Sequence, residues 1–302
     1  MIYVWFDALA NYISALEYGV GGERYREWWE GSDERVHVIG KGIIRFHAVY
    51  WPAILLSAGE ALPTAIFVHD YLSVEGQKLS KSAGHTHDPV EIADRFGTDA
   101  LRWWFLRDVP RTGDADFREA LLAVRANELA DGLGNLVNRT ITLVNRYRPQ
   151  GVVATPSRSG EATTLHAVLG ATPAEIDTAL AHFDFRAATT ALWRLVDAAN
   201  RFVTTTRPWE LAKAEAGGGP HTGSSLDEVL HALLSACSVL ARELEPFLPA
   251  ASGRIARALS DSDPQRGRRL FIKPAPPRDA RLVAAHPRSA SRRYEQRASR
   301  SR

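Results

Sequence analysis

The sequence is short of features that would each indicate a particular class of protein. It has one cysteine, Cys237, which excludes an internal disulfide and a cysteine-rich zinc site; its apolar surroundings, LLSACSVL, predict a small buried side chain. No apolar run approaches the ~18 residues of a membrane span, and MIYVWFDALANY has no basic stretch before an apolar one. We therefore expect no membrane contact, no signal peptide and a cytoplasmic location.

Most of the positive charge is concentrated at the C-terminal end. From Arg266 onward the sequence holds eleven arginines and Lys273 against Asp279 and Glu295, a balance of +10 within a chain of formal net charge +2. This composition buries little apolar surface and predicts a basic disordered tail over residues 261–302. Such a tail can contact RNA phosphates, and an extension without a role is the alternative.

The first part of the chain has the pattern of an α/β layer. VHVIG (Val36 to Gly40) and AIFVHDYLSV (Ala65 to Val74) are rich in β-branched and aromatic residues, as strands are. Between them, IIRFHAVYWPAILLSAG has the length of a helix. The order strand, helix, strand predicts a parallel sheet within residues 1–75.

The rest of the chain has the pattern of helices. Asp88 precedes Pro89 and Glu91, a typical helix start, Gly97 ends that helix, and Thr98 is the expected cap of the next. From about residue 118 to residue 260, apolar residues recur at helical spacing, with amphipathic stretches over 174–205 and 226–259. The fold class expected is α/β followed by all-α.

The segment GQKLSKSAG, residues 76–84, has a composition suited to phosphate binding. Lys78, Ser80, Lys81 and Ser82 offer two ammonium groups and two hydroxyls, and the flanking glycines allow a tight bend. The segment also follows a strand, the end of a parallel sheet where ligands usually bind. A solvated basic turn is the alternative.

Six segments together resemble one enzyme family. In chain order they are VWFDALANYISAL, HVIGKGIIRFHAVYWPAILLSAG, KLSKS, DALRWWFLRDVP, GNLVNRT and RPWELAK. They resemble the C-terminal part of bacterial methionyl-tRNA synthetases, which are class I aminoacyl-tRNA synthetases, from Ile2 to Leu259. The resemblance implies the second half of a Rossmann-type catalytic domain (1–75), a KLSKS loop and stem-contact region (76–117) and an α-helical anticodon-binding domain (118–260).

The same resemblance implies methionine–tRNA ligase activity and assigns roles to residues. Lys78 and Lys81 would act in catalysis by stabilising the triphosphate of ATP, with Ser80 and Ser82 also binding ATP and Mg²⁺ expected alongside it. The residues implied to line the methionine pocket are Trp5, Ala8, Tyr12, Ile43, His47 and Trp51. Without the resemblance, the two tryptophans would be interpreted as core and His47 as a buried, hydrogen-bonded imidazole.

In the helical part, the resemblance implies that Asn135, Arg139 and Trp209 recognise the CAU anticodon of methionine-accepting tRNA. Asn135 and Arg139 are four residues apart and so share a helix face. Amide, guanidinium and indole groups suit single-stranded bases, which are recognised by hydrogen bonds and stacking. The alternative is an ordinary polar helix face, with Trp209 packing after Pro208.

The sequence departs from the family pattern in several places. Gly42 replaces an aspartate, Asp70 a glycine and His85 an asparagine, and the HIGH motif that holds ATP is absent. Half of a parallel sheet would expose an apolar face, so we expect a truncated product or one piece of a split enzyme whose partner is an upstream polypeptide. A non-catalytic tRNA-binding module and a synthetase-derived protein acting on another small molecule are the alternatives.

Overall fold

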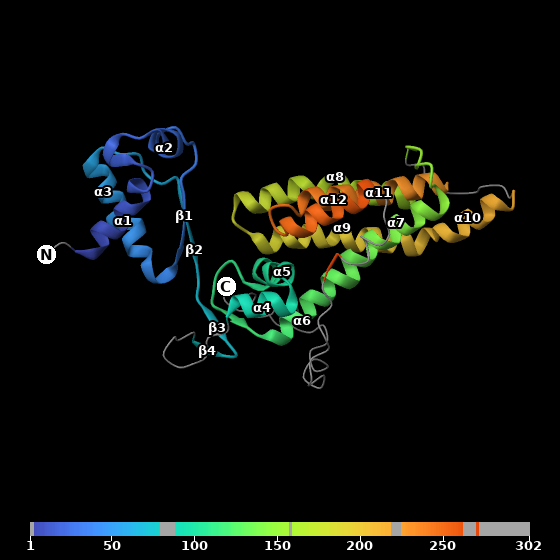
Figure 1. The fold of residues 1–302 in the computed structure, drawn as a ribbon, viewed down its shortest axis with the longest axis horizontal. Coiled ribbons are helices and arrows are strands. Elements are labelled where there is room, and N and C mark those ends of the chain that lie inside the picture. The colour runs from blue at the N-terminus through green and yellow to red at the C-terminus, as the bar shows by residue number, and fades with distance from the viewer. Residues whose placement is uncertain (1–2, 79–87, 157–158, 219–224, 262–269, 272–302) are drawn as a thin grey trace, which may run out of the picture. The chain divides into compact units, whose positions relative to one another are not determined.

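The computed structural model describes residues 3–78, 88–156, 159–218, 225–261 and 270–271. The chain divides into an N-terminal unit, residues 1–78 and 110–116, and a helical unit, residues 79–109 and 117–302, each described by itself (Figure 1). The elements of the first are α1 (Val4–Ser14), α2 (Glu23–Tyr25), β1 (Val36–Gly40), α3 (Trp51–Ala58), β2 (Ala65–His69), β3 (Leu72–Val74), β4 (Gln77–Lys78) and most of β5 (Ala115–Phe117).

The N-terminal unit contains the predicted parallel strand pair. β1 and β2 pair in parallel, with Val36 opposite Ala65 and Gly40 opposite His69. The segment between them is helical, as predicted, although it is a π-type turn (η4, Phe46–Tyr50) that continues into α3. The predicted single strand over 65–74 is wrong, because the chain leaves β2 after His69 and starts β3 in a separate sheet of order β4-β3-β5.

A small aromatic core holds the helices of this unit together. α1 buries Leu9 and Ile13, α3 buries Trp51 and Leu55, and α2 with the following turn adds two aromatic rings. The buried residues of this core are Leu9, Ile13, Tyr25, Trp29, Trp51 and Leu55.

The helical unit begins with two short helices, α4 (Pro89–Phe96) and α5 (Thr98–Asp108). The predicted start of α4 is confirmed, since the Asp88 carboxylate accepts the Val90 N–H at 2.8 Å. Gly97 ends α4 at φ 87°, a value that favours glycine. The prediction that Thr98 caps α5 is wrong: Thr98 is the first helical residue, and Gly97 stands at the cap position without a side-chain bond.

The all-α part of the prediction is confirmed, with different helix boundaries. The helices are α6 (Glu119–Glu128), α7 (Asn135–Tyr147), α8 (Gly160–Ala181), α9 (Phe185–Thr206), α10 (Pro208–Ala216), α11 (Leu226–Glu243) and α12 (Pro249–Asp261). The expected stretch 174–205 is divided because Asp184 caps a new helix by accepting the Ala187 N–H. The expected stretch 226–259 is divided before Pro249, which occupies the first turn of α12.

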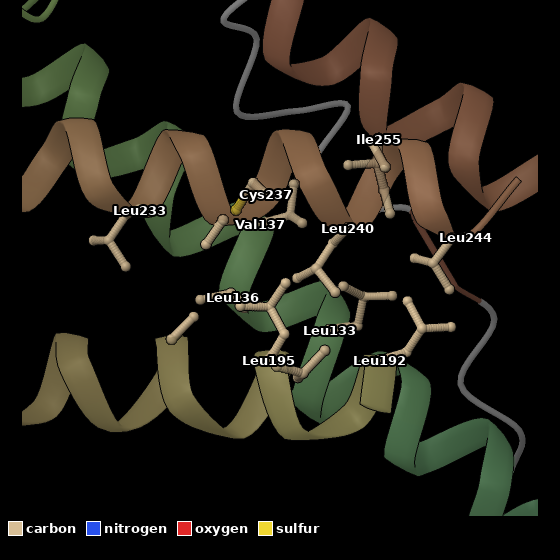
Figure 2. Close-up of a cluster of buried hydrophobic side chains, with 14 of the residues drawn as sticks. Leu133, Leu136, Val137, Leu192, Leu195, Leu233, Cys237, Leu240, Leu244 and Ile255 are labelled. Carbon is tan, nitrogen blue, oxygen red and sulfur yellow. The ribbon is translucent and has the colours of Figure 1, made fainter. Parts of the chain in front are cut away.

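The core of the helical unit lies where α7, α9, α11 and α12 meet (Figure 2). Leucines from these helices and from the turn before α7 interdigitate around Val137 and Cys237. The predicted burial of Cys237 is confirmed, and burial raises the pKa of its thiol to about 12. Two residues of the expected disordered tail are also packed. Leu270 is buried, and its carbonyl accepts the Arg254 Nε–H at 3.0 Å, while Phe271 is partly buried against the same core.

Candidate functional site

The described part of the N-terminal unit brings together polar and aromatic side chains from three segments. Tyr12 comes from α1, His47 from the turn before α3, and Trp51 from the start of α3. The Tyr12 hydroxyl and His47 Nε2 are 2.9 Å apart, and the other ring nitrogen, Nδ1, is 3.0 Å from the Ile43 carbonyl. A carbonyl oxygen can only accept a hydrogen bond, so Nδ1 carries the proton. In the neutral ring, Nε2 then accepts the hydrogen bond from the Tyr12 hydroxyl.

A second histidine, which was not predicted from the sequence, belongs to this cluster. His37 lies on β1, is buried, and accepts the Trp51 indole N–H at Nε2 over 3.0 Å. Its ring centroid is 4.3 Å from that of Tyr12 and 5.9 Å from that of His47. Burial, together with the neighbouring His47, lowers the pKa of His37 to about 4, so the ring is neutral near pH 7.

The six residues expected to line a pocket lie in the same unit but differ in their surroundings. His47 and Trp51 are buried, and Trp51 also meets Trp29 edge to face. Trp5, Ala8, Tyr12 and Ile43 are half-buried. Trp5 stacks on Phe46 with a centroid separation of 3.9 Å, at the border of the aromatic core. The cluster therefore combines two buried side chains, His47 and Trp51, with four half-buried ones.

The neutral state of His37 predicts a pH dependence. In the unfolded chain its pKa is about 6.5, above the folded value, so the unfolded state binds the proton first as the pH falls. Stability is therefore lost as the pH falls through 6.5 toward 4. From pH 7 to pH 5 we expect His37 to lower the free energy of unfolding of the N-terminal unit by about 2 kcal/mol. Urea denaturation at the two pH values measures this loss.

The matched control is His37→Gln, which keeps an oxygen able to accept the Trp51 N–H but does not titrate. All other titrating groups are common to both proteins, so the difference between their pH slopes isolates His37. Equal slopes for the two proteins would contradict the assigned neutral state.

Lys41, in the turn after β1, is held by two carboxylates of the same unit. Its Nζ lies 2.9 Å from Asp70 and 2.5 Å from Asp114. The hydrogen bond from Lys41 lowers the pKa of both carboxyls, so they stay ionised. Asp70, one of the departures from the family pattern, thus pairs with a lysine and also accepts the Gly113 N–H. Gly42, another departure, lies against the Tyr71 hydroxyl, which occupies the space of a Cβ.

The KLSKS segment is only partly described. The backbone of Lys78 ends β4, opposite Ser73 of β3. Ser80, Lys81, Ser82 and His85 lie outside the described residues.

The three residues expected to contact an anticodon lie on two helices of the helical unit. Asn135 and Arg139 are exposed, one turn apart on α7. Trp209 is 43% exposed at the start of α10, whereas the preceding Pro208 is buried. α10 packs against α7 through Leu211, which joins a cluster with Val144 and Tyr147. Part of the Trp209 indole is therefore open to solvent.

Sequence comparison identifies relatives of both units. Residues 1–141 match the family described as tRNA synthetases class I (M). The methionine–tRNA ligase of Caldanaerobacter subterraneus is 39% identical over 82% of this chain and 38% of its own length. The enzyme of Bacillus subtilis is 35% identical over 87% of this chain and 39% of its own length.

The chain belongs to the methionyl-tRNA synthetase family. A solved structure of the Mycobacterium tuberculosis methionyl-tRNA synthetase bound by methionyl-adenylate matches 90% of this chain and 55% of that chain, with a TM-score of 0.73 and 31% identity. The apo form of that synthetase matches with a TM-score of 0.71 and 30% identity over 84% of this chain and 49% of that chain. The fold is thus that of a class I synthetase, with Rossmann-type and helical parts. The chain spans about two fifths of the length of its curated methionyl-tRNA synthetase relatives.

Two further features of this methionyl-tRNA synthetase homologue concern the described residues alone. No helix among them is both long and apolar enough to cross a membrane. They also hold no group of three or more histidine, cysteine, aspartate or glutamate residues placed to bind a metal ion.

Proposed function

We propose that this chain is the part of a methionine–tRNA ligase that binds methionine, contacts the triphosphate of ATP and recognises the anticodon of methionine-accepting tRNA in the cytoplasm. The observation that carries the proposal is the Tyr12–His47–Trp51 cluster, which lies within the matched family region. A polarizable thioether suits a slot of aromatic rings, and an unbranched side chain suits a narrow one.

In this proposal the KLSKS segment stabilises the negative charge of ATP while methionine is activated. The methionine carboxylate attacks the α-phosphorus of ATP, which enters as its Mg²⁺ complex, and pyrophosphate leaves. Lys78 and Lys81 stabilise the charge on the phosphate oxygens, while Ser80 and Ser82 donate hydrogen bonds to them. Lys41 has a different role, because its ammonium group already pairs with Asp70 and Asp114.

The exposed apolar face of the N-terminal unit supports a role for further polypeptide in catalysis. Along β1, Val36 and Val38 point outward and are exposed, while His37 and Ile39 point inward. Parallel sheets are normally covered on both faces. We propose that a polypeptide carrying the HIGH motif covers this face when the ligase is active.

Methionine-dependent ATP–pyrophosphate exchange tests this proposal. It is measured on the chain alone and after addition of the HIGH-bearing part of a related synthetase. We expect no exchange from the chain alone, exchange in the mixture, and loss of that exchange on Lys81→Ala. Exchange by the chain alone would contradict the proposal that activity requires a polypeptide carrying the HIGH motif. Absence of exchange in every mixture, with tRNA binding retained, would favour the tRNA-binding module instead.

The exposed indole of Trp209 predicts a large contribution to tRNA binding. Stacking of a single-stranded base on an aromatic side chain contributes about 1–3 kcal/mol, so Trp209→Ala should weaken binding of a methionine-accepting tRNA by about fivefold to 150-fold. Fluorescence anisotropy at about 0.15 M salt, where screening limits the contribution of the basic tail, measures the change.

A matched control is Trp28→Ala, which removes another exposed tryptophan, 62% accessible, from the N-terminal unit. We expect that variant to bind tRNA as the unmodified chain does. Equal affinity for Trp209→Ala and the unmodified chain would contradict the anticodon role of Trp209.

A further inference from the structure

We propose that Asp116 is a positioning residue that holds Lys78 in place to contact phosphate. This inference rests on the function proposed for Lys78. It starts from the hairpin formed by β3 and β4, in which Ser73 pairs with Lys78 and Val74 pairs with Gln77. The place of the Lys78 backbone is therefore set by the hairpin register and by the turn between the two strands.

The hairpin turn is strained and needs support from outside. Its two central residues, Glu75 and Gly76, have φ values of 51° and 77°. Two left-handed residues form the type I′ turn that suits a two-residue hairpin, and asparagine or glycine is preferred at the first position. Glu75 lacks that preference, because its Cβ disfavours the left-handed region. The hairpin is also short: its strands, Leu72–Val74 and Gln77–Lys78, have three and two residues, so by itself it buries little area that could stabilise it.

Asp116 supplies the missing support from the neighbouring strand, β5. Its Oδ1 accepts the Gly76 N–H at 2.8 Å and the Ser73 hydroxyl at 2.8 Å. One oxygen atom thus joins the turn to the strand that pairs with Lys78. Ala115 and Phe117 on either side of Asp116 are buried, so the backbone that carries the carboxylate is fixed.

Asp116 could act on phosphate binding in two ways, through its negative charge and through the hydrogen bonds that it accepts. The two effects have opposite signs, so substitutions can separate them. A negative charge near a phosphate site repels the ligand, so its removal alone should strengthen binding. Loss of the acceptor oxygen should instead free the hairpin turn and weaken binding. Asp116→Asn removes the charge but keeps Oδ1 as an acceptor, whereas Asp116→Ala removes both.

The experiment measures protection of Lys78 itself. The full chain is titrated with inorganic tripolyphosphate, treated briefly with acetic anhydride, and analysed by mass spectrometry for acetylation of each lysine. Lys213 of α10 serves as the internal reference. The arginines of the basic tail are not acetylated, so polyanion binding there does not enter the Lys78 readout.

We expect saturable protection of Lys78 in the unmodified chain, equal or tighter protection in Asp116→Asn, and about tenfold weaker protection in Asp116→Ala. Equal or tighter protection in both variants would overturn the positioning role and leave the function of Lys78 intact. Absence of Lys78 protection in the unmodified chain would overturn both the phosphate contact and the inference built on it. Because Asp116→Asn keeps the hydrogen bonds, weaker protection in that variant would also contradict the proposal.

Discussion

Replacing Trp51 with alanine is expected to lower the free energy of unfolding of the N-terminal unit by about 4 kcal/mol. The indole is fully buried, contacts Tyr12 and Trp29, and donates its N–H to His37. Its removal leaves a large cavity in a core of only a few residues and an unpaired acceptor on His37. Since a whole domain is stable by about 5–15 kcal/mol, this loss should leave the unit largely unfolded under mild denaturing conditions.

Hydrogen exchange during urea denaturation, followed by mass spectrometry, measures this effect locally. Peptides from α1 and α3 should lose protection at a lower urea concentration, whereas peptides from α11 should not change. Trp28→Ala is the matched control, because Trp28 is exposed in the same unit; a change of less than about 0.5 kcal/mol is expected for it. A Trp51→Ala protein as stable as the Trp28→Ala protein would contradict the described core.

The second large effect is expected at Arg125, in the helical unit. Its guanidinium binds both oxygens of Asp108 at 2.7 Å and donates to Glu128 at 3.0 Å. Glu128 in turn pairs with Arg107 and accepts the indole N–H of Trp103. These groups link α5 to α6 and are each a quarter exposed or less. Arg125→Met should therefore destabilise the unit by about 3 kcal/mol, chiefly because Asp108 loses its partner.

A double variant separates the loss of stability caused by the unpaired Asp108 charge from the loss caused by missing side-chain packing. In Arg125→Met with Asp108→Leu, no carboxylate is left alone at position 108, and we expect at least half of the lost stability to return. Thermal unfolding followed by circular dichroism compares the single and double variants. Destabilisation of less than about 0.5 kcal/mol by Arg125→Met would show that the network contributes as little as an exposed ion pair.

The sequence predicted those features that depend on local pattern. The parallel pairing of 36–40 with 65–69 follows from β-branched strands around a helical segment, and the start of α4 follows from Asp88 and Pro89. The family resemblance implied that Tyr12 and His47 line one pocket, but it did not predict the hydrogen bond between them. Spacing cannot place residues 35 positions apart at 2.9 Å.

The features that were missed depend on tertiary packing. His37 was interpreted as a strand residue, although the alternation of β1 places it on the inward face with Ile39 and could have identified it. The end of α8 near Ala181 had a local signal in Asp184, an N-cap residue inside an otherwise helical pattern. No local signal predicts that Arg254 of α12 pairs with Asp99 of α5.

The two units support different parts of the proposed function. The N-terminal unit combines a hydrogen-bonded aromatic cluster with an open apolar face, so its chemistry is proposed to require further polypeptide. The helical unit has a continuous buried core, and its exposed Asn135, Arg139 and Trp209 are accessible to RNA. Recognition of tRNA is therefore the activity that we expect from the chain without a partner.

Equilibrium binding of a methionine-accepting tRNA, compared with the same tRNA carrying a changed anticodon, tests this expectation most directly. Both RNAs offer the same phosphates to the basic tail, so the difference reports contacts to the anticodon bases. We expect at least about tenfold tighter binding of the tRNA with the CAU anticodon. Equal affinity for the two RNAs would contradict the assignment of this chain as an anticodon-reading part of a methionine–tRNA ligase.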